Sequence, residues 1–579
     1  MVYDLFIEYN KKLMKKLLTV LSLLAIIIAS SWALTHDQFF RAHDYIHVAR
    51  VIEIYRALSD GQLPVRWSEN FGYGYGMPLF EFYAPLPYYI GAALHWLGFE
   101  VLTVVKLLFL FSAIFTTYGA YKLGNRFFGR SGAILTAAAI TLAPYRAVNL
   151  FVRGALSEAW GIMAMPWILL GILQIVGREK NGWKTLTISL VVLMLSHNIM
   201  TMLFVPLSLL FTVLFLGYRK WIVHKNKKSE LGALLRVNGS LLLATGLSSF
   251  YLFPALIEKN LTKVESIFSG YFHYSHHFLY IRQFFILNWG YEGSAWGPDD
   301  GLSFFLGWGQ LVGLVIVILL LLNRIRQKKW RQIITDKKIV LSVLLGALFG
   351  LSLFMAILKS KFLWDTLPGL SYAQFPWRFL GVGIIFLGLL VGMSASLIKR
   401  RRLRYLWTLV LLIVLLFNAQ FFQPKEFLAD ANQFYYTDAE TIQREMSGIL
   451  PDYIPVQMAE QLSPPTTLAW CDGGCEKEIE VLINRSHENL IKTNFKTDKT
   501  VEFAVADFVG WEVEIDGQLA EKKIGSVGNI AVDVTAGDHL VGTRFVSSRV
   551  RFWSDLITVF SLSVFVYLLI ELRKEKEAV

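Results

Sequence analysis

The chain leaves its first apolar segment, LLTVLSLLAIIIASSWAL at residues 17–34, directly into THDQFFRAHDYIHVAR at residues 35–50. The first segment is long enough to cross a bilayer, which takes roughly 17–25 apolar residues. The second segment collects two Asp, three His and two Arg where the chain leaves the membrane. Ionisable groups are costly at that boundary unless they serve a function. The stretch therefore predicts a membrane scaffold that presents a polar site at its outer surface.

Residues 44–50 favour a helix in which Asp44 and His47 share one face, with His43 one turn before His47. A carboxylate beside an imidazole can accept a proton or bind a metal ion. The alternative is an interfacial helix whose polar face meets lipid head groups. We take Asp44, His43 and His47 as the candidate catalytic residues.

Composition places the chain among membrane proteins that cross the bilayer several times. Of its 579 residues, 55% are hydrophobic and 17% are charged, and the mean hydropathy is +0.47. These values are too apolar for an ordinary soluble protein. The net charge of +12 does not indicate a nucleic-acid partner, because the basic residues lie in short loops between apolar runs, where they set membrane topology.

About twelve apolar runs are long enough to be membrane spans. In chain order they are 16–34, 101–121, 131–145, 158–176, 184–197, 199–217, 232–253, 304–322, 339–357, 378–397, 404–420 and 552–571. Every second loop is basic, which predicts that these loops and both termini lie in the cytoplasm. The motif Ser31-Trp32-Ala33 resembles a signal-peptidase site, but the length of the first run favours a retained anchor.

The topology implies three regions and a membrane-embedded bundle of helices. Residues 1–420 form the transmembrane domain, with outer interfacial helices at about 44–60 and 80–99. Residues 421–551 are extracytoplasmic, and their first part, 421–465, is expected to be helical and exposed. Residues 552–579 supply the last span and a cytoplasmic tail.

A small β domain is predicted at about 466–550, just before the last span. Short runs of alternating apolar residues are separated by turn residues such as Asp516-Gly517, a pattern typical of antiparallel, sandwich-like sheets. The expected strands are Lys477–Ile483, Thr500–Val505, Trp511–Ile515, Gly528–Val534 and His539–Phe545. Cys471 and Cys475 lie in this region, and the sequence leaves open whether they form a disulfide bond.

Four arginines are candidates for binding a phosphate group on the outer side. Arg146 and Arg153 lie in a short outer loop, and Arg378 begins a span on the outer side, against the positive-inside trend. Arg50 lies in the opening polar stretch. The forked donors of arginine match the geometry of a phosphate. The alternative is ordinary contact with lipid head groups.

A second carboxylate, an outer histidine and several aromatic residues complete the candidate site. Glu158 opens a span, either as a catalytic group or as a favourable charge at a helix N-terminus. Tyr73, Tyr75 and Trp377 are expected to stack on a sugar or a prenyl chain. His197 lies at an outer turn. With Asp44 and His47 it forms a candidate site for a divalent metal such as Mg²⁺ or Mn²⁺.

Several short motifs resemble a known family. They are His43-Asp44, Pro144-Tyr145-Arg146, Ser196-His197-Asn198, Leu367-Pro368 and Gln374-Phe375-Pro376-Trp377-Arg378-Phe379. They resemble the bacterial membrane family labelled "6-pyruvoyl-tetrahydropterin synthase related", and more broadly the GT-C superfamily of polytopic glycosyltransferases. Asp44 matches the acidic residue of that superfamily's first outer loop. The second nearby carboxylate often found there is replaced in this chain by His43.

The resemblance implies transfer of a sugar from a polyprenyl-phosphate donor to a cell-envelope acceptor, such as a polysaccharide, teichoic acid or glycolipid. The reaction would take place on the outer face of the bacterial cytoplasmic membrane. Two alternatives stay open, a transporter or flippase of lipid-linked glycans and a non-catalytic envelope assembly protein. A transporter usually needs ionisable groups near mid-membrane, and the predicted spans hold almost none.

Overall fold

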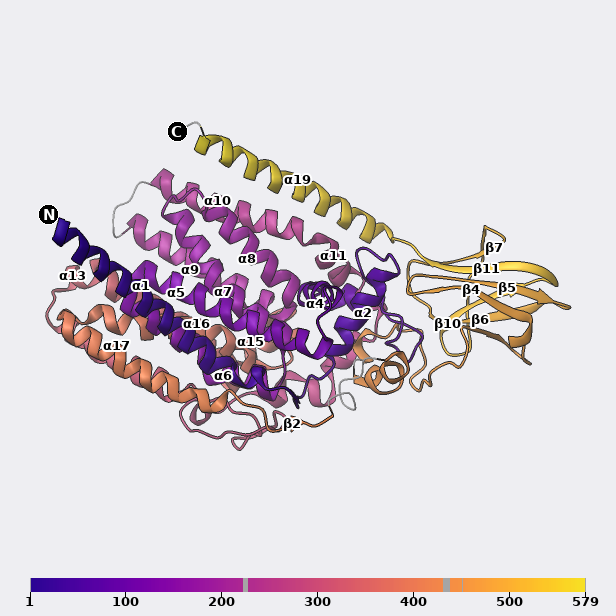
Figure 1. The fold of residues 1–579 in the computed structure, drawn as a ribbon, viewed down its shortest axis with the longest axis horizontal. Helices are drawn as coiled ribbons and strands as arrows, with labels where there is room; N and C mark the ends of the chain where they lie inside the picture. Colours follow the sequence, from indigo (N-terminus) through magenta and orange to yellow (C-terminus); the bar gives the residue numbers. More distant parts are fainter. Residues whose placement is uncertain (1, 222–226, 431–437, 450, 578–579) are drawn as a thin grey trace. The chain divides into compact units, whose positions relative to one another are not determined.

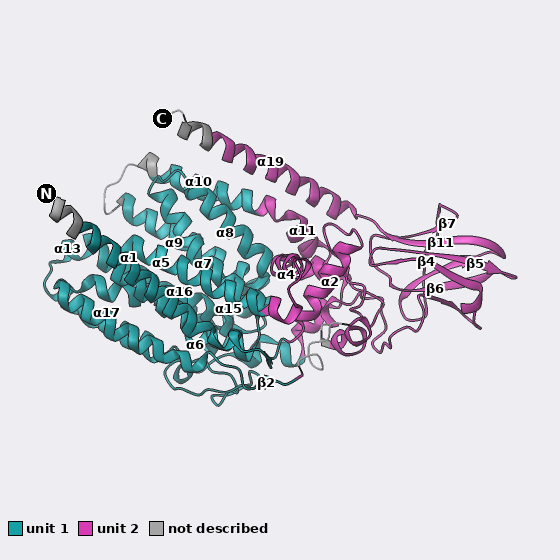
Figure 2. Ribbon diagram, in the orientation of Figure 1, with its two compact units in different colours: residues 1–44, 106–244, 270–429 teal, residues 45–105, 245–269, 430–579 magenta. Residues whose placement is uncertain are grey.

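A computed structural model describes residues 2–221, 227–430, 438–449 and 451–577. The chain divides into two compact units (Figure 2). Unit 1 comprises residues 1–44, 106–244 and 270–429, and unit 2 comprises residues 45–105, 245–269 and 430–579.

Unit 1 is almost entirely helical (Figure 1). Its main helices are α1 (Val2–Ser31), α5 (Val101–Thr141), α6 (Pro144–Ala147), α7 (Leu156–Val176), α8 (Gly182–Ser196), α9 (Asn198–Trp221), α10 (Lys227–Leu247), α12 (Trp308–Arg326), α13 (Trp330–Thr335), α14 (Lys337–Ala356), α15 (Lys361–Thr366), α16 (Phe379–Leu397) and α17 (Arg401–Leu416). Helices α5 and α10 each have a few terminal residues in unit 2.

Within the described residues, nine helices are long and apolar enough to cross a membrane, or ten if one bent pair counts as a single span. The sequence predicted about twelve, and all twelve segments are helical. The count is lower for three reasons. Helix α5 merges two predicted spans across a break at Gly129, α8 is short, and α10 meets α11 at a bend of 77°.

Helices α7 and α16 form the interior of unit 1. The most apolar windows of these helices are 89% and 94% buried. Glycines let α16 approach α5 closely: a Cβ atom at Gly392 would lie 1.9 Å from Thr136 Oγ1, and one at Gly388 would lie 2.3 Å from Ile140 Cγ1. Small residues allow such backbone approach in membrane helices, where packing replaces the hydrophobic effect.

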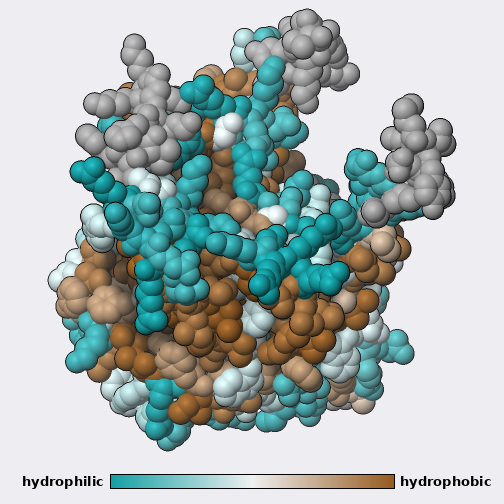
Figure 3. All heavy atoms as spheres, turned by 90° about the vertical axis from the view of Figure 1, so that its left-hand side faces the viewer, coloured by the Kyte–Doolittle hydropathy of each residue, from teal (hydrophilic) through white to brown (hydrophobic). Residues whose placement is uncertain are grey.

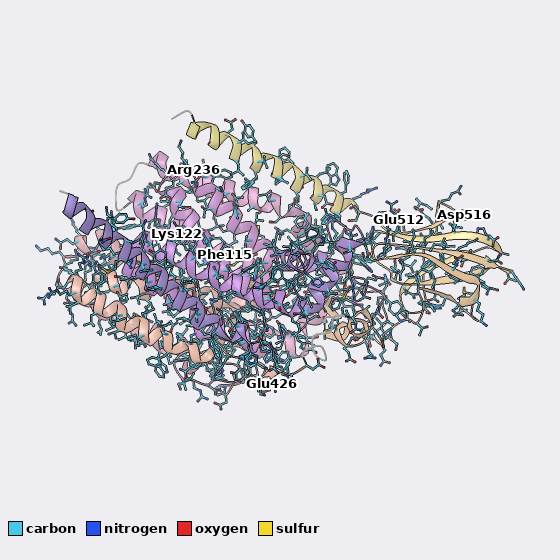
Figure 4. All side chains as sticks on the ribbon, viewed as in Figure 1. Phe115, Lys122, Arg236, Glu426, Glu512 and Asp516 are labelled. Carbon is cyan, nitrogen blue, oxygen red and sulfur yellow. A yellow bond between two sulfur atoms is a disulfide. The ribbon has the colours of Figure 1, made fainter. Side chains whose placement is uncertain are left out.

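The loop after α1 is fixed within unit 1 by a short antiparallel pair of strands, β1 (Phe39–Phe40) and β2 (Phe427–Leu428). Next to the pair, Arg41 Nη1 lies 2.9 Å from Glu426 Oε1. Figure 3 shows a band of hydrophilic side chains beside a broad apolar area on one face of the molecule. Glu426 is labelled in Figure 4.

Unit 2 combines short helices, two β-sheets and one long helix. The helices are α2 (His47–Ser59), α3 (Leu79–Phe82), α4 (Leu86–Trp96), α11 (Ser249–Ile257), α18 (Ala439–Thr441) and α19 (Arg549–Glu577). Only 11% of the most apolar window of α19 is buried. The prediction that residues 421–465 are helical holds in part for the described residues. Helix α18 continues as a π-helical turn at Ile442–Met446 and as 3₁₀ turns at Ser447–Ile449 and Pro451–Tyr453, and the remaining described residues form β2 and irregular chain. Residues 431–437 and 450 lie outside them.

The two sheets are antiparallel throughout. One has the strand order β3-β6-β10-β9 and the other β4-β5-β11-β7-β8. The strands are β3 (Ala469–Cys471), β4 (Ile479–Arg485), β5 (Glu488–Phe495), β6 (Lys499–Ala506), β7 (Trp511–Ile515), β8 (Gln518–Ala520), β9 (Lys523–Ile524), β10 (Asn529–Val534) and β11 (Gly537–Phe545).

The fold class predicted from the sequence, a polytopic helical bundle with a small β domain before the last apolar helix, is confirmed. All five expected strands are present, and β3, β5, β8 and β9 were missed. Alternate residues of β5 are buried, as on the inner face of a sheet that covers a core. Cys471 and Cys475 form a disulfide bond, which the sequence had left open.

Candidate functional site

A buried carboxylate lies at the centre of the polar cluster in unit 1. Glu158, in the first turn of α7, is 1% exposed. Its Oε1 accepts hydrogen bonds from Tyr145 Oη at 2.7 Å and Asn149 Nδ2 at 3.1 Å. Its Oε2 accepts from Arg153 Nη1 at 2.7 Å and lies 3.5 Å from Arg378 Nε. Two cations therefore meet at one buried anion.

Local backbone geometry brings these groups together. Pro144 opens α6, and Val148–Val152 continues it as a π-helical turn, which places Asn149 and Arg153 on the side of Glu158. π-Helical turns are rare and frequently occur at functional sites. Arg153 Nη1 also donates to Asn149 Oδ1 at 2.6 Å, which fixes the guanidinium further.

Arg378 is held from the opposite side, at the start of α16. Its Nη1 donates to the carbonyl oxygen of Ala373 at 2.8 Å and to Gln374 Oε1 at 3.3 Å. Gln374 has φ of +57°, a conformation that costs energy in a residue with a side chain and often accompanies function. The loop thus maintains a strained turn that fixes Arg378 beside Glu158.

Trp377 supports the arginines and does not offer a free ring face. It is 2% exposed. The Arg153 guanidinium carbon lies 4.6 Å from the Trp377 ring centroid, and the Phe375 ring stacks on Trp377 at 4.8 Å. The structure therefore corrects the prediction that Trp377 stacks on a sugar or prenyl chain, because neighbouring side chains already cover the ring.

Asp44 is fixed next to this cluster by main-chain hydrogen bonds. The Asp44 amide donates to the Arg153 carbonyl oxygen at 2.7 Å, and the His43 amide donates to that of Val152 at 3.0 Å. The Asp44 side chain is exposed. Burial lowers the pKa of Arg153, but the charges of Glu158 and Asp44 raise it by more, so its pKa lies above the ordinary value. An accessible carboxylate thus borders two buried cations.

Gly154 is required for this arrangement, and we expect Gly154→Ala to lower both stability and activity. Its φ is +67°, and a Cβ atom there would lie 2.8 Å from Ala42 Cβ. The added methyl group would push the chain that carries Asp44 away from Arg153. Gly129→Ala is the matched control, because Gly129 has φ of +68° but nothing within 4 Å of its Cβ position.

Thermal unfolding and activity of both glycine variants test this expectation. Both positions have positive φ, so each substitution is expected to add backbone strain of about 1–3 kcal/mol. We expect Gly129→Ala to retain its activity. We expect Gly154→Ala to lower the rate of activity at least about tenfold, the change that 1.4 kcal/mol in the barrier produces. Equal activities would show that the contact between Gly154 and residues 42–44 does not position Asp44.

Arg146 is buried but does not reach Glu158. It is 0% exposed, and its Nη1 donates to the Thr141 carbonyl oxygen at 3.1 Å. Its Nε and Nη2 have no hydrogen-bond partner among the described residues. Burial lowers the pKa of Arg146 to about 10, so it stays a cation at neutral pH. A buried cation of this kind is costly unless an anion compensates it.

Sequence reasoning missed a polar network behind Trp377. Ser294 Oγ accepts from Trp377 Nε1 at 3.1 Å, bonds to His277 Nδ1 at 3.0 Å and donates to Asp300 Oδ2 at 3.3 Å. Burial raises the pKa of Asp300 to about 6. The run Gly297-Pro298-Asp299-Asp300-Gly301 signals a turn, but nothing in it indicates that Asp300 folds inward.

Four predicted site residues belong to unit 2. Helix α2 begins at His47, so Asp44 precedes it and the predicted shared helical face does not form. His47 Nδ1 bonds to Tyr88 Oη at 2.7 Å, and Arg50 lies 3.7 Å from the Tyr83 ring centroid. Tyr73 and Tyr75 also lie in this unit, where Tyr75 is 7% exposed and contacts Trp470 edge-on.

The predicted metal set does not assemble. In the part of the chain that the structure describes, no group of three or more His, Cys, Asp or Glu side chains is arranged to hold a metal ion. His197 accepts a hydrogen bond from the Met200 amide at 3.0 Å through Nδ1. This contact satisfies an amide in the first turn of α9, so that nitrogen of His197 is already used in the fold.

A family model described as "6-pyruvoyl-tetrahydropterin synthase related domain; membrane protein" matches residues 80–424, more than half of the chain. An uncharacterized protein of Lactococcus lactis subsp. cremoris (strain MG1363) is 25% identical over 290 residues, which are 49% of this chain and 45% of that relative. The match therefore spans less than half of the relative's length.

Among solved structures, the chain is similar to an arabinofuranosyltransferase, to ArnT and to an oligosaccharyltransferase. The arabinofuranosyltransferase AftD from Mycobacteria has a TM-score of 0.37 at 13% identity, covering 71% of this chain and 28% of that one. ArnT from Cupriavidus metallidurans, bound to undecaprenyl phosphate, has a TM-score of 0.37 at 14% identity, covering 68% of this chain and 62% of that one. The Archaeoglobus fulgidus oligosaccharyltransferase has a TM-score of 0.44 at 11% identity, covering 73% of this chain and 57% of that one.

Proposed function

The chain belongs to the 6-pyruvoyl-tetrahydropterin synthase related family of membrane proteins, and from the geometry of its buried cluster we propose that it transfers a sugar between membrane-bound partners. The donor is a sugar carried on polyprenyl phosphate, and the acceptor is a cell-envelope glycan or glycolipid. The reaction takes place at the outer face of a bacterial cytoplasmic membrane, with both termini of the chain in the cytoplasm. The arrangement of Asp44 beside Arg153 and Arg378 carries this proposal.

Asp44 is the proposed general base. The hydroxyl group of the acceptor must lose a proton as its oxygen forms a bond to the anomeric carbon of the sugar. A carboxylate positioned by the backbone and open to solvent can take that proton. His43, whose Nε2 bonds to the Tyr291 carbonyl oxygen at 2.9 Å, fixes the chain beside Asp44.

Arg153 and Arg378 are proposed to bind the phosphate that leaves. As the bond between the anomeric carbon and the phosphate oxygen breaks, polyprenyl phosphate gains negative charge. Positively charged groups fixed in advance stabilise such charge strongly in a site that excludes water. Arg146 is as fully buried as Glu158 and offers no open face to a phosphate, so we do not assign it a phosphate contact.

Glu158 is proposed to position the arginines and not to transfer a proton. Both of its oxygens already accept hydrogen bonds or lie against a guanidinium. Its burial leaves no route for an acceptor hydroxyl. This role differs from the catalytic role predicted from the sequence, and it follows from the contacts that only the folded chain creates.

The transporter alternative has less support. A carrier must bind its cargo from both sides of the membrane, usually through ionisable groups near the middle. In the described residues Glu158 lies in the first turn of α7 and Arg378 lies immediately before α16, so neither charge is near the middle of a span. An assembly protein without catalytic activity would have no need of an exposed carboxylate next to paired arginines.

Replacing Arg378 tests the proposal. We expect Arg378→Gln to lower sugar transfer about 100-fold to 1,000-fold, the loss seen when one group that stabilises a developing charge is removed. Arg153 still compensates Glu158 in this variant, so the protein should fold. The measurement is transfer from a radiolabelled polyprenyl-phosphate sugar in detergent micelles.

The matched control is Arg282→Gln. Arg282 is 51% exposed and pairs with the exposed Asp299, so its loss changes the same charge away from the cluster. We expect it to transfer at the wild-type rate. A folded Arg378→Gln variant with an unchanged rate would remove Arg378 from the phosphate site.

A further inference from the structure

A groove of about 1130 Å³ lies in unit 1 where α12 ends and α17 begins, and neither Glu158 nor Arg378 lines it. One wall is apolar. Leu403, Leu406 and Val410 line it at the three- and four-residue spacing of a single helix face. They are 50%, 58% and 44% exposed, so no other described part of the chain covers that face.

Cationic side chains line the other side of the groove. Arg324 Nη2 lies 2.6 Å and Lys328 Nζ 3.2 Å from Asp336 Oδ2. Asp336 also accepts from the amides of Lys338 and Ile339 at the start of α14. Four cationic residues and one carboxylate line the groove, which leaves a net charge of +3.

Lys399 and Arg400 are the uncompensated members of this set. Both are exposed, and neither side chain has an ion pair or hydrogen bond among the described residues. Asp336, the groove's only carboxylate, is already occupied by Arg324 and Lys328. The groove therefore combines unpaired cations with an apolar wall, and Lys399 and Arg400 precede the first residue of that wall, Leu403, by only three to four positions.

The packing of α12 and α17 shows why space remains here. Toward the other ends of the two helices, Gly309 allows close contact: a Cβ atom there would lie 2.7 Å from Leu415 Cδ2. At the groove end the lining residues Asn323, Arg324 and Gln327 have longer side chains than glycine and do not allow such close contact. Long side chains line the opening, and the space between the helices stays unfilled.

We propose that this groove binds an anionic phospholipid, with its phosphate at Lys399 and Arg400 and its acyl chains along Leu403, Leu406 and Val410. Basic clusters beside membrane helices attract anionic head groups by about 1 kcal/mol per Lys or Arg. The volume suits a head group with the first part of its chains. Figure 3 faces this end of unit 1 and shows hydrophilic side chains next to broad apolar surface.

The positive-inside pattern assigns this end to the cytoplasmic leaflet. The proposed lipid site is thus separate from the proposed transfer site and does not depend on it. Its ligand is a resident lipid and not the sugar donor.

The test is lipid retention by the purified full chain in native mass spectrometry, with phosphatidylglycerol or phosphatidylcholine added at equal concentration. We expect the wild type to retain phosphatidylglycerol preferentially. We expect Lys399→Gln/Arg400→Gln to bind it about tenfold to thirtyfold more weakly, the loss expected for two basic side chains at a membrane surface. Both side chains are exposed, so the fold should be unaffected.

The control variant is Arg401→Gln/Arg402→Gln, which removes the same charge from adjacent exposed residues that do not line the groove. It should bind phosphatidylglycerol like the wild type. Equal losses in both variants, or no preference in the wild type, would overturn the site. Displacement of the lipid by an equal concentration of inorganic phosphate would also overturn it, because acyl chains would then contribute nothing.

Discussion

Asp44→Asn should reduce sugar transfer by about 100-fold to 10,000-fold, the range that a positioned general base contributes. The amide keeps the size of the side chain but cannot take the acceptor's proton. Asp44 is exposed, and its main-chain bonds to Arg153 do not involve the carboxylate. We therefore expect the variant to insert in the membrane and unfold like the wild type. Transfer from a polyprenyl-phosphate sugar measures the effect.

Asp37→Asn is the matched control for this prediction. Asp37 is exposed in the same loop, and its carbonyl oxygen, not its carboxylate, accepts from Lys106 Nζ at 3.1 Å. The substitution removes the same charge near the same surface. We expect wild-type transfer. Full activity in Asp44→Asn, or the same loss in both variants, would show that Asp44 is not the base.

Glu158→Ala should have the largest effect on stability. The substitution leaves Arg153 and Arg378 buried without the anion between them. Removing one partner of a buried ion pair costs about 3–5 kcal/mol, because the remaining charge is uncompensated. We expect the unfolding midpoint in mixed detergent micelles to fall accordingly, together with loss of transfer.

The comparison variant is Glu179→Ala. Glu179 also pairs with one arginine, Arg126, but the side chains are 39% and 35% exposed. A pair so accessible to water contributes about 1 kcal/mol or less. Similar losses in the two glutamate variants would mean that the ion cluster around Glu158 is no more important than a surface salt bridge.

The position of the cluster at the ends of apolar spans could be predicted from the sequence, because charged residues there are visible as exceptions to the membrane pattern. Glu158 and Arg378 stood out for that reason, and both lie in the cluster. Asp44 stood out as an acid directly after the first span. Spacing along the chain is enough to place such residues at a membrane boundary.

The partners within the cluster could not be predicted in the same way. Tyr145 and Asn149 reach Glu158 through a π-helical turn, which has no simple sequence signal. The expected helix from Asp44 to His47 failed because residues 43–44 bond to the backbone of 152–153 and not to the following turn. The sequence predicts a stacking role for Trp377, but tertiary packing covers its ring with Arg153 and Phe375.

The most direct test of the proposed function uses vesicles that contain the full chain, a donor lipid with a radiolabelled sugar on polyprenyl phosphate, and an envelope glycan acceptor. The account predicts that label leaves the donor lipid, appears on the acceptor and frees polyprenyl phosphate, and that Asp44→Asn stops this transfer. Label that crosses the bilayer on an intact donor lipid, with none on the acceptor, would contradict it.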